Sequence, residues 1–81
     1  MNDDILKAID LALADEWEAA HRLVQRHEED ATASWVHAVL HKIEGDIGNS
    51  RYWYRRAGKL AHADDEPRAE LEVIRGEISG A

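Results

Sequence analysis

The chain has 81 residues, no cysteine and a formal net charge of −7. Without cysteine it can form neither a disulfide framework nor a thiolate metal site, and a cytoplasmic setting is the simplest expectation. The negative charge opposes binding to nucleic acid or to anionic membranes, and so short a chain is expected to form one domain, residues 1–81.

Apolar residues recur at helical spacing along the whole chain, and no alternating run is long enough to indicate a strand. Five helices are predicted, in chain order over residues 3–14, 15–28, 32–44, 47–61 and 67–80, with residue 49 as an alternative start of the fourth. In the first, Ile5, Ile9 and Leu13 form an apolar stripe. In the second, Trp17 and His27 lie on the side expected to face the core.

The ends of the later helices are marked by capping residues. Thr32 is expected to cap the third helix, and Ile43 is expected to point inward near its end. Gly45 and Asp46 predict a left-handed C-cap followed by the start of the fourth helix. Pro67 suits the first turn of the fifth. Because the connections are short, the five helices are expected to pack as antiparallel hairpins in a compact all-α bundle.

Small, turn and aromatic residues follow one another in a pattern typical of helical repeats. The residues concerned are Ala38, Gly45, Asp46, Ser50, Tyr54 and Ala57. In this order they resemble the tetratricopeptide and Sel1-like repeat families, which implies a tetratricopeptide-like hairpin. The run from Trp35 to Gly58 also resembles a small uncharacterised family of bacterial and fungal proteins with a tryptophan–histidine–glutamate–glycine–aspartate–tyrosine run. That second resemblance implies no activity.

Three residues of the third predicted helix could bind a metal ion. His37, His41 and Glu44 stand at i, i+4 and i+7, which places them on one stripe. Two imidazoles one turn apart can share a divalent ion such as zinc, with a carboxylate or a third histidine completing the set. His21 is the expected third histidine if the second and third helices pack side by side. The alternative is that these histidines simply bond to nearby carboxylates or carbonyls.

The segment from Arg51 to Lys59 interleaves basic and aromatic residues. Successive helical residues turn by about 100°, so Tyr52, Trp53 and Tyr54 cannot all face inward. Tyr54 is expected in the core, and at least one of the other two is expected at the surface. Arginines beside exposed aromatics suit an acidic peptide or a small anion. The alternative is that the arginines pair with the many acidic residues of the chain.

Two interpretations of function follow. The leading one is a non-enzymatic interaction or ligand-binding module that takes a protein or peptide partner or a second copy of itself. Its predicted surface combines His37, His41, Glu44, Tyr52, Trp53, Arg55 and Arg56. The alternative is a metal-binding protein or metal-dependent enzyme, with His21, His37, His41 and Glu44 as the predicted ligands. No catalytic residue and no membrane partner are predicted.

Overall fold

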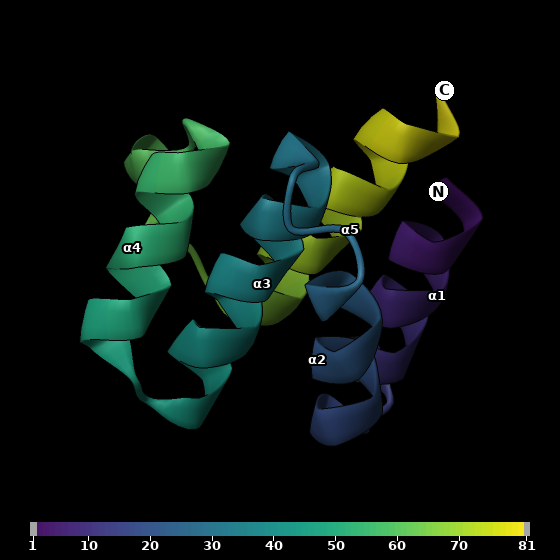
Figure 1. Ribbon diagram of the computed structural model, residues 1–81, viewed down its shortest axis with the longest axis horizontal. Coiled ribbons are helices and arrows are strands. Elements are labelled where there is room, and N and C mark those ends of the chain that lie inside the picture. Colours follow the sequence, from purple (N-terminus) through teal and green to yellow (C-terminus); the bar gives the residue numbers. More distant parts are fainter. Residues whose placement is uncertain (1, 81) are drawn as a thin grey trace.

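Five α-helices joined by short turns make up the fold. The computed structural model describes residues 2–80, so the first and last residues of the predicted domain lie outside it (Figure 1). The elements are α1 (Asn2–Leu13), α2 (Trp17–Gln25), α3 (Ala31–Glu44), α4 (Ile47–Ala57), a 3-10 helix (Leu60–His62) and α5 (Pro67–Ser79). Residues 2–80 contain no β-strand, so the prediction of a compact all-α fold of about five helices is confirmed.

Helix α3 is the centre of the molecule and contacts each of the other four α-helices. In Figure 1, α4 lies on one side of α3, α1 and α2 lie on the other side, and α5 passes behind it. The pairs α1–α2 and α3–α4 run antiparallel. Every residue from Ala33 to His41 is buried. Because α3 lies at the centre of the molecule, its polar side chains are buried together with its apolar ones.

The hydrophobic core draws on all five α-helices. Its largest apolar and aromatic side chains, all less than 2% exposed, are Ile5, Ile9, Val24, Trp35, Val36, Val39, Leu40, Tyr54, Leu71 and Ile74. Burial of such side chains is the main favourable contribution to folding. Among residues 2–80, no helix combines the length and the apolar character needed to cross a bilayer.

Several predicted helix ends differ from the observed ones, and α2 spans residues 17–25 instead of 15–28. Asp30, not Thr32, caps α3, and its carboxylate accepts a hydrogen bond from the backbone N–H of Ala33 at 2.8 Å. Helix α4 ends at Ala57 instead of residue 61, because Gly58 adopts a left-handed conformation with φ of +70°. At the turn between α3 and α4, Gly45 has the predicted left-handed conformation.

The prediction that Ile43 points into the core is wrong, since its side chain is 43% exposed. Ile43 lies one helical repeat of seven residues after Val36, so the two share a face of α3. The continuously buried part of α3 ends at His41, however, and residues 42–44 of its last turn are partly or fully exposed. The helical period was therefore predicted correctly, but the end of the buried stretch was not.

Candidate metal centre

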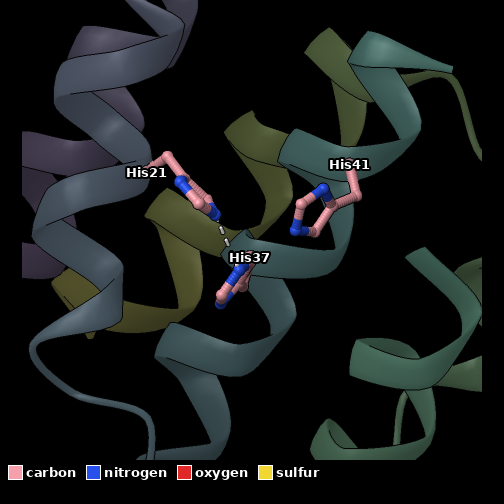
Figure 2. Close-up of side chains that lie close together, drawn as sticks. All are labelled: His21, His37 and His41. Carbon is pink, nitrogen blue, oxygen red and sulfur yellow. Dashed lines mark hydrogen bonds between the residues drawn. The ribbon is translucent and has the colours of Figure 1, made fainter. Parts of the chain in front are cut away.

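Helices α2 and α3 bring three histidines together at their interface. His21 comes from α2, and His37 and His41 lie one turn apart on α3 (Figure 2). The Nε2 atoms of His21 and His37 are 3.1 Å apart, and one nitrogen from each of the three rings lies within 4.8 Å of the other two. The structure thus places His21 beside the two histidines of α3, where it was predicted as the third ligand.

Two tryptophans hold the imidazole rings in place. The Trp17 ring stacks on His21 with a centroid distance of 4.6 Å, and the Trp53 ring stacks on His37 at 3.9 Å. Trp17 is itself anchored, because its indole N–H donates to the carbonyl of Leu40 at 2.6 Å. These contacts restrict rotation of the His21 and His37 rings, which preorganises the nitrogens of these two residues.

The histidines of the cluster are in a state suited to bind a cation. Burial, together with the neighbouring imidazoles of His21 and His41, lowers the pKa of His37 to about 3. Burial and the proximity of His41 also lower the pKa of His21 below its usual value. Neutral imidazole offers a lone pair, whereas the protonated ring does not. His37 is therefore a potential ligand throughout the neutral pH range.

His41 binds a carboxylate through the nitrogen that faces away from the cluster. Its Nδ1 lies 2.6 Å from Oε1 of Glu44, and its other ring nitrogen points toward His21 and His37 (Figure 2). When Nδ1 of the neutral ring donates to the carboxylate, Nε2 keeps its lone pair and can act as a ligand. A histidine that binds a metal commonly donates its other ring N–H to a carboxylate in this way. Glu44, predicted as a metal ligand, is grouped with His41 and Asp46, and not with His21 and His37.

The seven residues predicted to form one binding surface occupy two different environments. His37, His41 and Trp53 are buried, at 3%, 6% and 8% exposure. Arg55 is exposed, and Tyr52 is 48% exposed, which confirms the prediction that one aromatic of this segment reaches the surface.

Arg56 links the exposed part of this segment to the buried part. Its guanidinium lies 5.1 Å from the centroid of the Trp53 ring and donates to the carbonyl of Glu28 at 3.1 Å. It also donates to the hydroxyl of Tyr52 at 3.4 Å. Arg56 thereby ties α4 to the turn that precedes α3, next to the histidine cluster.

The other two histidines within the described chain bond to acidic partners. His27 Nε2 lies 2.8 Å from a carboxylate oxygen of Asp4, and His62 Nδ1 lies 2.7 Å from one of Asp65. These two histidines therefore make structural contacts with carboxylates, which is the alternative considered above for the histidines of the third helix.

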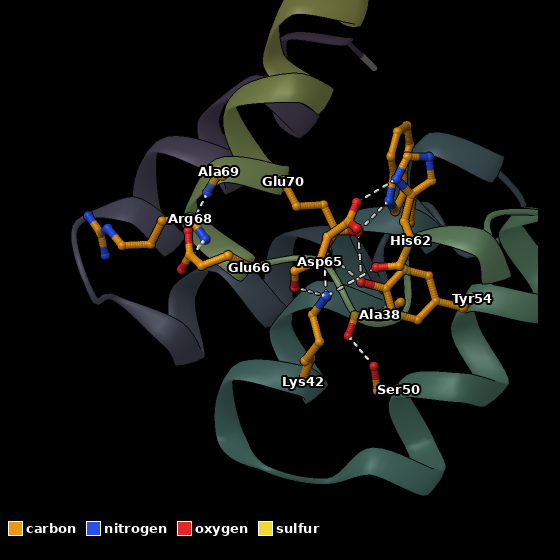
Figure 3. A network of polar contacts seen from close by, with 11 residues as sticks. Ala38, Lys42, Ser50, Tyr54, His62, Asp65, Glu66, Arg68, Ala69 and Glu70 are labelled. Atoms are coloured by element: carbon orange, nitrogen blue, oxygen red, sulfur yellow. Dashed lines mark hydrogen bonds and ion pairs between the residues drawn. The ribbon is translucent and has the colours of Figure 1, made fainter.

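A second polar network, which the sequence did not predict, surrounds the buried carboxylate of Glu70 (Figure 3). The Glu70 side chain is fully buried and lies 2.7 Å from Nζ of Lys42. It also accepts hydrogen bonds from the Tyr54 hydroxyl at 2.7 Å and from the Trp35 indole N–H at 2.8 Å. Burial and this carboxylate raise the pKa of Tyr54. One signal was present: Glu70 lies one turn before the apolar residue Ile74, so the two share a face of α5.

No family model, curated protein or solved structure shows a significant match to the chain. The resemblance to tetratricopeptide and Sel1-like repeats, and to the small bacterial and fungal family, therefore stays a prediction. The geometry of the described residues is the basis for the functional proposals.

Proposed function

We propose that this protein binds a divalent metal ion, with zinc as the best fit, through His21, His37 and His41. The observation that carries the proposal is the convergence of three imidazole nitrogens within 4.8 Å. Two nitrogen ligands of a tetrahedral zinc ion, with bonds of about 2.0–2.1 Å, lie about 3.3–3.4 Å apart. The Nε2 atoms of His21 and His37, at 3.1 Å, are already close to that separation.

Metal binding would replace one hydrogen bond in the cluster. At 3.1 Å, one of the two Nε2 atoms of His21 and His37 donates a proton to the other. Both atoms can bind an ion only after that proton has moved to the Nδ1 atom of the same ring or to solvent. For His41, the Glu44 carboxylate 2.6 Å from Nδ1 favours the neutral tautomer that carries its proton on Nδ1, and this tautomer leaves Nε2 open to an ion.

Metal analysis of the full chain, purified without a histidine tag, tests the proposal. We expect about one zinc per chain and a higher melting temperature in zinc than in chelator. The expected stabilisation is about 2.7 kcal/mol when free zinc is 100-fold above its Kd. The variant His21→Gln should lose most of the affinity for zinc, and we choose it because His21 is only partly buried. The matched control His62→Gln, at a histidine outside the cluster, should bind zinc as the parent does.

The alternative to a metal site is an internal pair of hydrogen-bonded histidines. In that case zinc would leave the melting temperature unchanged, and His21→Gln would bind no less metal than His62→Gln. Either result would remove the proposal. Any zinc that was still bound would then be weak surface binding, of the kind that exposed histidines and acids give in many proteins.

We also propose, as a second function, that the exposed face of α4 contacts a protein partner, first of all a second copy of the chain. Tyr52 supports this proposal, since it is a large aromatic that is 48% exposed and lies beside Arg55 and Arg56. Tyrosine and arginine are enriched at the centres of protein interfaces. Sedimentation should show dimers that Tyr52→Ala weakens, with Val73→Ala, at an exposed hydrophobic residue of α5, as a control. A parent chain that stays monomeric at high concentration would remove self-association.

A further inference from the structure

We propose that the metal ion at His21, His37 and His41 keeps an open fourth position, in which water is exchanged for a small anion. This inference rests on the proposed metal site and goes beyond it, because it distinguishes a reactive centre from a purely structural one. Structural zinc sites are closed by four protein ligands, whereas catalytic sites have three protein ligands and one water.

The first support is the number of donors that converge. Within residues 2–80, the group that includes both His21 and His37 contains three histidines and no further donor. The second group of potential ligands consists of His41, Glu44 and Asp46, and it shares only His41 with the first. The chain has no cysteine that could supply a fourth ligand.

The second support is the contact that holds Glu44. Its carboxylate lies 2.6 Å from Nδ1 of His41, whereas the other nitrogen of that ring points toward His21 and His37 (Figure 2). To reach an ion bound at Nε2, Glu44 would have to give up this charge-assisted bond. We therefore assign Glu44 as a positioning residue that orients His41, in the manner of carboxylates that bond to metal-binding histidines.

The third support is the charge at the site. Three neutral imidazoles leave both positive charges of a divalent ion uncompensated, unlike a site that contains thiolates or carboxylates. The guanidinium of Arg56 lies over the Trp53 ring, which in turn stacks on His37. A small anion in the fourth position would offset part of this charge, so an anion is the class of ligand that the donor set favours.

The fourth support is access from solvent. His37 and His41 are 3% and 6% exposed, but His21 is only partly buried. The cluster therefore lies at the edge of the core, and a small ion would approach it from the partly exposed side at His21. Three histidines and an exchangeable water are also the coordination found in zinc centres that activate water as a nucleophile.

Cobalt substitution tests the open position directly, because the visible spectrum of Co²⁺ reports its coordination. The full-length untagged chain is loaded with Co²⁺ at neutral pH and then titrated with sodium azide. We expect a saturable change in the visible spectrum with a stoichiometry of one azide per cobalt. A spectrum that cobalt produces and azide leaves unchanged would overturn the open position while leaving the metal site standing. Failure to bind cobalt or zinc at all would overturn both proposals.

The variant Glu44→Gln separates the two roles of this side chain. If Glu44 only positions His41, then Glu44→Gln should weaken cobalt binding by about 10- to 100-fold and leave the azide response in place. If Glu44 were instead the fourth ligand, the parent would show no azide response and Glu44→Gln would gain one, which would overturn the proposal. Glu77→Gln, at an exposed acid of α5, is the matched control and should change neither measurement.

Discussion

Replacing Lys42 by methionine should destabilise the fold strongly, because it leaves the carboxylate of Glu70 buried without a cation. The Glu70 side chain is fully buried, the Lys42 side chain is 12% exposed, and their charged atoms are 2.7 Å apart. Removing one partner of a buried ion pair costs about 3–5 kcal/mol. The remaining donors, Trp35 and Tyr54, partly compensate the carboxylate, so we expect a loss near the lower end, about 3 kcal/mol.

Urea unfolding, followed by circular dichroism, measures this loss at constant m-value. Lys7→Met, at an exposed lysine of α1, is the matched control and should change stability by less than about 0.5 kcal/mol. Lys42→Arg keeps the charge and should retain more stability than Lys42→Met. If the methionine variant does not fold, Lys42→Arg should still fold. A loss below about 1 kcal/mol for Lys42→Met would show that the Lys42–Glu70 pair does not hold the carboxylate in place.

Two further predictions concern the histidine cluster and a helix end. In chelator, lowering the pH from 7 to 5 should reduce stability by about 2 kcal/mol through His37, because the unfolded ring gains a proton near pH 6.5 while the folded ring stays neutral to about pH 3. His37→Gln should flatten this profile, and an equally steep profile in the variant would contradict the assignment. Gly58→Ala should cost about 1–2 kcal/mol, because its φ is +70°. Gly48→Ala, at a helical glycine, is the control and should be neutral or stabilising by thermal unfolding.

The parts of the site that depend on local geometry could be predicted from the sequence. The spacing of His37 and His41 fixes their common side of a helix, since residues four apart are neighbours on its surface. The Gly45–Asp46 turn predicts that the helices on either side fold back on each other, as Figure 1 shows for α3 and α4. His21 could be proposed as the third histidine because short connections bring α2 alongside α3.

The parts that depend on tertiary contacts could not be predicted. Glutamate is almost never fully buried without a partner, so the sequence alone favours a solvated role for Glu70. Its three donors come from α3 and α4, and only the folded chain brings Lys42, Trp35 and Tyr54 to it. The length of α4 was overestimated for a different reason. Gly58 lies inside a run that is otherwise favourable to helix, and its left-handed conformation ends the helix there.

The two polar networks occupy different sides of α3, and this arrangement makes stability and metal binding separable. Trp35 and Lys42 are seven residues apart, or almost two helical turns, so both face Glu70. His37 follows Trp35 by about 200° of rotation, and His41 precedes Lys42 by about 100°, so both histidines point away from Glu70. The contact with Glu70 fixes the position of α3, while another side of the helix presents His37 and His41 to His21 of α2. Lys42→Met should therefore lower the free energy of unfolding, yet its folded fraction should bind zinc with the affinity of the parent.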